Sequence, residues 1–237
     1  MFTYLTRSLN DLADPRYAVE VKRFFKTGKG DYGEGDIFLG IRTPLLRKLA
    51  KNHLSLPLRE LKWLLRSKIH EERLFALIVL VEKYKCEEKF ENESKKRALY
   101  LLYCRHFRFI NNWDLVDISA PHIVGRYLAD KDKGILLDWA KSSHLWTRRI
   151  AVVANWWFIR NGDLGMIFKV AKLLLDDPHD LIHKAVGWML REAAKKDRKK
   201  AMAFLERHHR KMPRVMLRYA IERYPSSLRK KFLIFFG

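Results

Sequence analysis

Arg148-Arg149-Ile150-Ala151-Val152-Val153 returns in similar form 35 residues later, as His183-Lys184-Ala185-Val186-Gly187-Trp188. Leu217-Arg218-Tyr219-Ala220-Ile221 follows after a further 34 residues, and counting 35 residues back from Arg149 reaches Asp114. Glu72-Arg73-Leu74-Phe75-Ala76 is a less regular copy. Apolar residues recur at spacings of three and four, which is typical of amphipathic helices. The chain therefore carries a helical repeat with a period in the mid-thirties.

A helical repeat of this length is typical of solenoids built from helix pairs, such as those of the HEAT type. We predict an all-α fold in which residues 1–237 form a single domain, an α-solenoid of HEAT-like repeats with about fourteen helices. Such stacks curve, and their inner helices line a concave surface, which would be basic here. The alternative is a compact helical bundle whose similar helices are coincidental.

The composition indicates a polyanionic partner. The 237 residues include 48 Lys and Arg against 27 Asp and Glu, which gives a formal net charge of +21. Charges of this size usually mark contact with nucleic acid or with an anionic membrane. The alternative is a protein that is merely very soluble. An apolar content of 48% allows a real core and argues against global disorder.

Several classes of protein are disfavoured by the sequence. Cys86 and Cys104 have no CxxC spacing, so neither a disulfide framework nor a zinc site is expected. His179 and His183 lie four residues apart but have no third ligand at a suitable spacing, and we predict no metal and no cofactor. The longest apolar run, Leu74–Val81, is too short to span a bilayer, and the N-terminus lacks the features of a signal peptide. We expect a cytoplasmic protein without membrane contact.

Helix starts are indicated at several prolines. Asp14-Pro15 and Thr43-Pro44 resemble an N-cap followed by the first helical residue. Asn111 resembles the start of a capping box before Trp113-Asp114. The Gly-rich stretch at residues 27–35 follows a predicted helix rather than a strand and lacks the P-loop spacing, so a flexible loop is expected there.

The main candidate for chemistry is Asn112-Trp113-Asp114-Leu115-Val116-Asp117. Trp113 and Asp117 are four residues apart and share one helix face with apolar neighbours. A carboxylate in such surroundings is costly unless it has a partner or a task. A carboxylate beside a Trp in a basic protein suggests catalysis on nucleic acid. The acid and the ring would then meet a positive charge that develops during the reaction. The alternative for Asp117 is a buried pair with a repeat arginine, and for Asp114 a contact with free N–H groups of the first turn.

Two later helices carry further candidates. Arg149 lies on an apolar stripe with Trp146 and Ile150, where it could clamp a phosphate, pair with Asp117, or simply tie adjacent helices together. In the next repeat Trp188 lies outside the predicted buried stripe, on a face that also carries cations. An exposed Trp among cations fits contact with a base, a sugar or a cationic ligand, whereas the alternative is a Trp that covers a neighbouring repeat. The buried stripe of that helix is predicted to contain Ile182, Ala185, Val186, Met189, Leu190 and Ala193.

These segments together resemble the DNA alkylation repair glycosylases of the AlkD family, which are built from HEAT-like repeats. The matching runs occur in the same order from about residue 20 to residue 225. They are Phe38-Leu39-Gly40-Ile41-Arg42-Thr43-Pro44, Trp113-Asp114-Leu115-Val116-Asp117, Trp146-Thr147-Arg148-Arg149 and Lys184-Ala185-Val186-Gly187-Trp188-Met189-Leu190-Arg191-Glu192.

The resemblance implies a monofunctional glycosylase that removes cationic alkylated purines, such as 3-methyladenine and 7-methylguanine, from duplex DNA. By position, Asp117 matches the catalytic carboxylate, and Trp113 and Trp188 match the aromatic residues that face the lesion. Arg149 matches a DNA-contacting arginine, and Phe24 falls near a third aromatic position. For the DNA backbone we predict Arg148, Lys184 and Arg191. A monomer is expected, and the alternative function is a non-catalytic HEAT-like protein that binds damaged or branched DNA.

Overall fold

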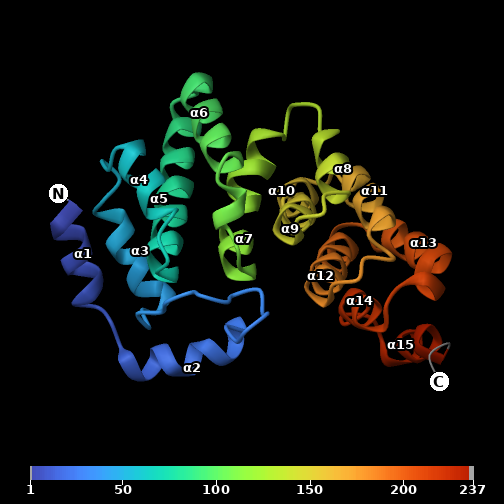
Figure 1. Ribbon diagram of the computed structural model, residues 1–237. Coiled ribbons are helices and arrows are strands. Elements are labelled where there is room, and N and C mark those ends of the chain that lie inside the picture. Colours follow the sequence, from blue (N-terminus) through green and yellow to red (C-terminus); the bar gives the residue numbers. More distant parts are fainter. Residues whose placement is uncertain (1, 235–237) are drawn as a thin grey trace. The chain divides into compact units, whose positions relative to one another are not determined.

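The computed structural model describes residues 2–234, and these form helices joined by short connections (Figure 1). No strand occurs among them, and the one β-type pairing is an isolated parallel bridge between Ile37 and Ile69. The predicted all-α, HEAT-like fold is confirmed. None of the helices in these residues combines the length and the apolar character needed to cross a membrane.

The chain divides into two compact units, residues 1–123 and residues 124–237. A single repeat domain over the whole chain stays a prediction. The helices of the first unit are α1 (Phe2–Asn10), α2 (Pro15–Phe25), α3 (Thr43–Lys51), α4 (Leu58–Leu64), α5 (His70–Lys89), α6 (Glu93–Cys104), the 3-10 turn η1 (Phe107–Phe109) and α7 (Trp113–Ala120).

Helix α5 is the centre of the first unit. Its apolar run Leu74–Val81 is buried on every side, because α3, α4, α6 and α7 all pack against this helix. A helix that is apolar all round belongs in a core, and burying the run contributes a large share of this unit's stability.

The N-caps observed in the first unit agree only in part with those predicted from the sequence. Asp14 caps α2 as predicted, since its carboxylate accepts the N–H groups of Arg16 and Tyr17 at 3.0 and 3.1 Å. The N-cap predicted at Thr43 is wrong, because α3 already includes it and Arg42 precedes the helix. The cap of α7 is likewise Asn112 rather than Asn111, and its side chain accepts the N–H of Trp113.

The second unit contains the clearest repeats. Its helices are α8 (Ile135–Ala140), α9 (Leu145–Val153), α10 (Asn155–Arg160), α11 (Gly165–Leu173), α12 (Asp180–Lys196), α13 (Arg198–His208), the 3-10 turn η3 (His209–Lys211), α14 (Arg214–Ala220) and α15 (Ser226–Leu233). The predicted repeat copies are α9, α12 and α14, and α12 packs directly against both of the others. The sequence period therefore corresponds to successive helices of one stack.

All six residues predicted for the buried stripe of α12 are buried. Gly187, which the sequence did not assign to that stripe, is buried too, and it allows α14 to approach closely. A Cβ atom at this position would lie 2.4 Å from the carbonyl oxygen of Met216 and 2.5 Å from Cβ of Tyr219. Only glycine fits there, so the run Ala185-Val186-Gly187 sets the spacing between these two helices.

Candidate active site

Helix α7 presents the two residues on which the predicted chemistry depends. Trp113 and Asp117 are both half-buried, whereas Val116 and Ala120 between and beyond them are fully buried. The side chains of Trp113 and Asp117 are one helical turn apart. The predicted common stripe is therefore present, with a carboxylate at the edge of an apolar surface.

Trp113 belongs to an aromatic cluster that comes from three distant parts of the chain. The ring of Phe25, at the end of α2, stacks on Trp113 with centroids 5.4 Å apart. Phe25 also stacks on Phe38 at 5.1 Å. The neighbouring Phe24 is instead 71% exposed. Phe25 thus supports Trp113, and contact of Phe24 with a substrate stays a prediction.

A short loop holds Phe38 in this cluster. The N–H of Ile37 donates to the carbonyl of Lys68, and the N–H of His70 donates to the carbonyl of Ile37, at 3.0 and 2.8 Å. The carboxylate of Glu71 then accepts three successive backbone N–H groups, those of Leu39, Gly40 and Ile41, at 2.9, 2.8 and 3.3 Å. A buried carboxylate satisfied in this way fixes the loop to the start of α5.

Gly40 explains why this loop, one of the family-like motifs, has its particular sequence. Its φ of 78° is in the left-handed region, and a Cβ atom there would lie 2.1 Å from the carbonyl oxygen of Asp14. Arg42 in the same motif lies over the ring of Tyr17, 4.2 Å from the centroid. The loop is therefore packed against the first turn of α2, the helix that carries Phe25.

A buried ion-pair network lies next to the aromatic cluster. Nε2 of His70 is 2.8 Å from Oδ2 of Asp114, and Nδ1 is 3.7 Å from Oδ2 of Asp36. Asp36 also accepts from Arg73 at 2.7 Å and from the amide of Asn111 at 3.1 Å. The imidazole stacks on Phe38 with centroids 4.7 Å apart.

The opposite charges in this network stabilise the ionised forms of His70 and Asp36. Burial opposes the charged form of His70, but attraction to Asp114 and the hydrogen bond with it, together with Asp36, raise the pKa of His70 to about 9. Burial would likewise raise the pKa of Asp36, but contacts with His70, Arg73 and Asn111 hold it below its usual value. At neutral pH an imidazolium therefore lies between two carboxylates beneath the first turn of α7.

Asp117 interacts electrostatically with Tyr103, a buried residue of α6. The hydroxyls of Tyr103 and Ser119 are hydrogen bonded at 2.8 Å, and Ser119 donates to the carbonyl of Leu115 at 2.5 Å. Burial raises the pKa of Tyr103, and the negative charge of Asp117 adds to that shift. Tyr103 is therefore uncharged at neutral pH, and Asp117 is close enough to interact with it electrostatically.

In the second unit, the predicted cations are engaged by the protein itself. Arg149 is only 5% exposed and donates to the carbonyl of Leu181 at 2.6 Å. This contact agrees with the alternative in which the arginine ties adjacent helices together. Arg148 pairs with Asp177 at 2.6 Å and also donates to two backbone carbonyls.

The other two predicted backbone contacts are similar. Lys184 pairs with Asp180 one turn earlier at 2.5 Å, and Arg191 pairs with Glu222 beyond α14. Trp188 lies outside the buried stripe as predicted, but it is half-buried rather than exposed. Roles of these side chains toward DNA stay predictions, and a structural role is already visible for Arg148, Arg149 and Arg191.

Sequence reasoning missed the buried charged groups at the start of α5. His70, Glu71, Glu72 and Arg73 are 2 to 4% exposed, although charged residues at a helix start are usually solvated. Their signal was a dense run of charges directly before the apolar core of α5. Periodicity alone could not reveal their partners, which lie in other parts of the chain.

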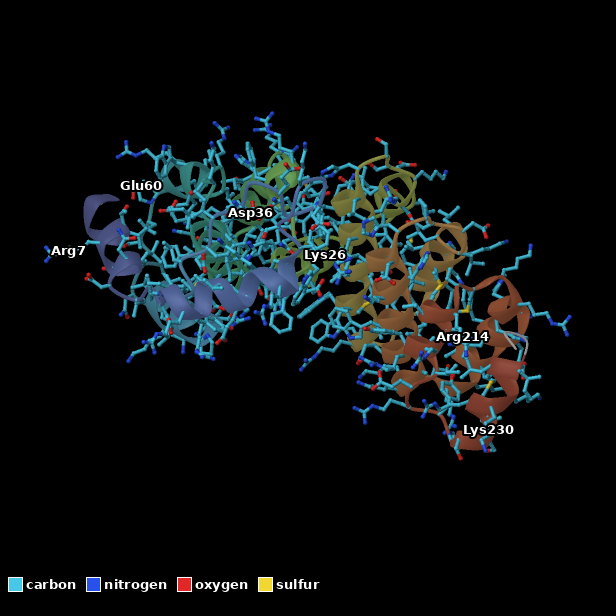
Figure 2. All side chains as sticks on the ribbon, turned by 60° about the horizontal axis from the view of Figure 1, so that its bottom comes forward. Arg7, Lys26, Asp36, Glu60, Arg214 and Lys230 are labelled. Carbon is cyan, nitrogen blue, oxygen red and sulfur yellow. The ribbon has the colours of Figure 1, made fainter. Side chains whose placement is uncertain are left out.

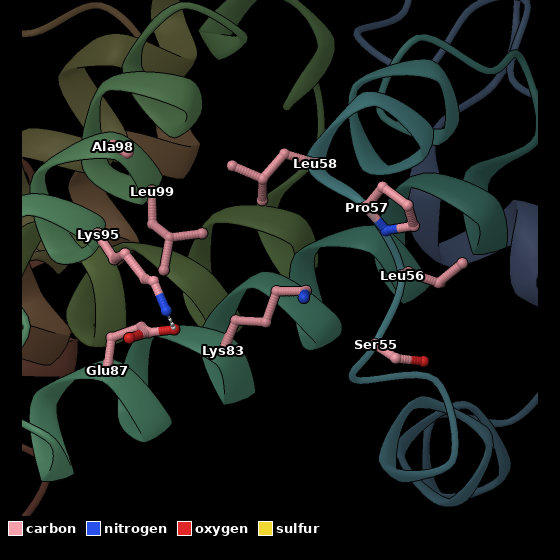
Figure 3. A pocket seen from close by; sticks show the side chains of 9 residues that line it. All are labelled: Ser55, Leu56, Pro57, Leu58, Lys83, Glu87, Lys95, Ala98 and Leu99. Carbon is pink, nitrogen blue, oxygen red and sulfur yellow. Dashed lines mark ion pairs between the residues drawn. The ribbon is translucent and has the colours of Figure 1, made fainter.

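Within the described residues, no group of three or more His, Cys, Asp or Glu side chains is arranged to hold a metal ion. The Gly-rich loop caps its own N–H groups, since Gly28 and Gly30 donate to Asp31 and Glu34. Figure 3 shows a cavity of about 370 Å³ that is lined by the connection into α4 and by residues of α5 and α6. Its Lys95 pairs with Glu87 at 3.5 Å, and none of the predicted site residues lines it.

Comparison with known proteins gives the following matches. A family model described as DNA alkylation repair enzyme matches residues 5–224. A predicted DNA alkylation repair enzyme from Enterococcus faecalis has a similar structure, with a TM-score of 0.66, 16% identity and coverage of 90% of this chain and 97% of its own. The protein smu.31 from Streptococcus mutans has a TM-score of 0.48 at 18% identity, with coverage of 86% and 89%. No curated protein matches the chain.

Proposed function

Because this chain belongs to the family of DNA alkylation repair enzymes, we propose that it is a DNA glycosylase. Its substrates are cationic alkylated purines, such as 3-methyladenine and 7-methylguanine, in duplex DNA. The observation that carries the proposal is the pairing of Trp113 with Asp117 on α7, a helix whose first turn is held by the His70–Asp114 ion pair.

The reaction is hydrolysis of the N-glycosidic bond. The bond between C1′ and the purine nitrogen breaks, and its electron pair neutralises the positive charge of the methylated base. Positive charge then develops on the sugar, where the carboxylate of Asp117 stabilises it. Water adds to C1′, and Asp117 orients that water and accepts its proton. The methylated base is a good leaving group, so no strong general acid is required.

Trp113 contributes through the electron-rich face of its ring. A cationic base or a cationic sugar is attracted to such a face by about 0.5–1 kcal/mol at an exposed site and by about 2 kcal/mol or more where water is excluded. Its stacking on Phe25 limits the orientations that the indole can adopt. Rigid placement supports catalysis, because a positioned group needs no reorganisation when the charge develops.

The remaining assignments come from the family resemblance. Trp188 and Phe24 are proposed to contact the substrate. Arg149, in the second unit, is proposed to contact DNA. The enzyme is proposed to be monofunctional and monomeric, with no metal or cofactor, and to release the base without cutting the strand. Its net charge of +21 supports binding to the DNA polyanion.

The direct test uses duplex DNA that carries 7-methylguanine. We expect free 7-methylguanine and an intact strand with an abasic site, which breaks only after treatment with hot alkali. Strand cleavage without alkali would contradict a monofunctional enzyme. Salt-sensitive binding of the duplex without any released base would instead favour a non-catalytic DNA-binding protein.

A further inference from the structure

The first unit contains an open polar cavity of about 350 Å³ next to the start of α7. It lies where the loop before α5 meets the turn η1, and Asn111, directly before the cap of α7, forms part of its wall. Four cationic side chains line it, those of Arg66, Lys68, Arg73 and Arg108.

The negative charges of this cavity are already satisfied. Asp36 is held by Arg73 at 2.7 Å and by Asn111, and Glu34 accepts the N–H of Gly30 at 2.8 Å. The other three cations, Arg66, Lys68 and Arg108, are exposed. Nowhere in residues 2–234 does a carboxylate form an ion pair with any of them. Nitrogen-tipped side chains project from both units (Figure 2). Cations without an ion pair therefore identify a binding surface better than the presence of cations alone.

An aromatic ring organises two of these cations. The guanidinium carbon of Arg108 lies 4.6 Å from the ring centroid of Phe109, and that of Arg66 lies 5.9 Å away. Contact with the ring restrains both side chains without using their N–H groups in an ion pair. A restrained guanidinium loses less entropy when it binds a phosphate with two parallel hydrogen bonds.

The buried residue His106 is affected by the positive charges of this region. The pKa of His106 is lowered, first by burial and also by the like charges of Arg66 and Arg108, although a hydrogen bond to the carbonyl of Leu102 opposes the shift. Such a field attracts anions and repels further cations.

We propose that Arg66, Lys68 and Arg108, arranged around Phe109, bind the phosphodiester backbone of DNA. The proposal rests on the proposed function, because it identifies a backbone contact for that same substrate. It differs from the sequence prediction, which assigned this task to Arg148, Lys184 and Arg191, all of which pair with carboxylates.

A strand fits this surface better than a small anion does. The three cations are separately exposed around an open cavity, whereas a single small anion requires convergent, buried donors. A DNA strand offers successive phosphates that can meet the cations one by one. Since Asn111 lines the cavity, a strand bound here passes the start of the helix that carries Trp113 and Asp117.

The test measures binding of an undamaged duplex, so that it does not depend on base excision. In the double variant Arg66→Ala/Arg108→Ala, we expect the Kd to rise by roughly tenfold and the slope of log Kd against log salt to fall by about 2. The control is Lys89→Ala/Arg97→Ala, which removes the same charge outside the cavity. Lys89 ends the 20-residue helix α5, about 30 Å from its start, and Arg97 lies on α6. The control should leave the salt slope nearly unchanged.

Two further measurements make the result specific. The variant Arg66→Lys/Arg108→Lys keeps the charge, so it should restore most of the salt slope. Inorganic phosphate at constant ionic strength should not displace the duplex. Equal effects of the two double alanine variants, or displacement by inorganic phosphate, would overturn the proposal. If neither the unaltered protein nor any variant released a base, the proposed glycosylase function would be wrong. The result on DNA binding would still stand.

Discussion

His70 and Asp114 form a buried ion pair, with Nε2 and Oδ2 2.8 Å apart, that joins the start of α5 to the first turn of α7. The other oxygen of Asp114 accepts the N–H of Leu115 at 2.8 Å. The imidazole also contacts Phe25 in a tilted arrangement, with ring centroids 4.9 Å apart, and Phe25 in turn stacks on Trp113. One imidazolium therefore connects the ion-pair network, the aromatic cluster and the helix that carries Asp117.

Replacement of His70 by Leu should destabilise the first unit strongly. The variant would leave the carboxylates of Asp36 and Asp114 without their shared cation, which costs about 3–5 kcal/mol for a broken buried pair. Urea unfolding followed by circular dichroism measures the change. His70→Gln, which keeps a hydrogen-bonding side chain, should lose less. A loss under 1 kcal/mol in His70→Leu would show that the pair does not hold the fold.

Stability should fall as the pH rises from about 6.5 to about 9. The pKa of His70 is near 6.5 in the unfolded chain and about 9 in the folded one, so the native state binds more protons in this range. The stabilisation is complete below pH 6.5 and is lost above pH 9, with a total of roughly 3 kcal/mol. Urea unfolding at several pH values measures it. His70→Gln should lack this component, and an identical pH profile in both proteins would contradict the assignment.

Gly40→Ala should cost much more stability than Gly30→Ala. Both glycines have a φ near 80°, so alanine is strained by about 1–2 kcal/mol at either position. At Gly40 the new Cβ would also lie 2.1 Å from a backbone oxygen, whereas nothing lies within 4 Å at Gly30. Thermal unfolding of both variants isolates the effect of the clash. Equal losses would mean that the loop can move away from α2.

Arg148→Ala should lower the stability of the second unit more than it lowers affinity for DNA. Arg148 pairs with Asp177, whose other oxygen accepts the N–H of His179 before α12. Loss of these largely part-buried hydrogen bonds should cost about 1–3 kcal/mol, since it leaves the buried carboxylate of Asp177 without its cation. Lys184→Ala is the comparison, because its ion pair with Asp180 is more exposed and should contribute little. A tenfold loss of DNA affinity by Arg148→Ala at unchanged stability would restore its predicted contact with the backbone.

The sequence predicted the faces of the helices better than their partners. The period placed α9, α12 and α14 correctly, and it identified the buried stripe of α12, because both follow from local spacing. The stacking of Phe25 on Trp113 joins residues that are far apart in the chain, and nothing local distinguishes Phe25 from Phe24. The buried carboxylate of Glu71 was equally hidden, since its partners are backbone N–H groups of a distant loop.

Single-turnover release of 7-methylguanine from duplex DNA, compared between the unaltered protein and Asp117→Asn, tests the central claim most directly. The carboxylate is proposed to stabilise the developing sugar cation, and its neutral replacement should slow release by about 100-fold or more, with unchanged affinity for undamaged duplex. Release at the same rate by both proteins would show that Asp117 is not the catalytic carboxylate.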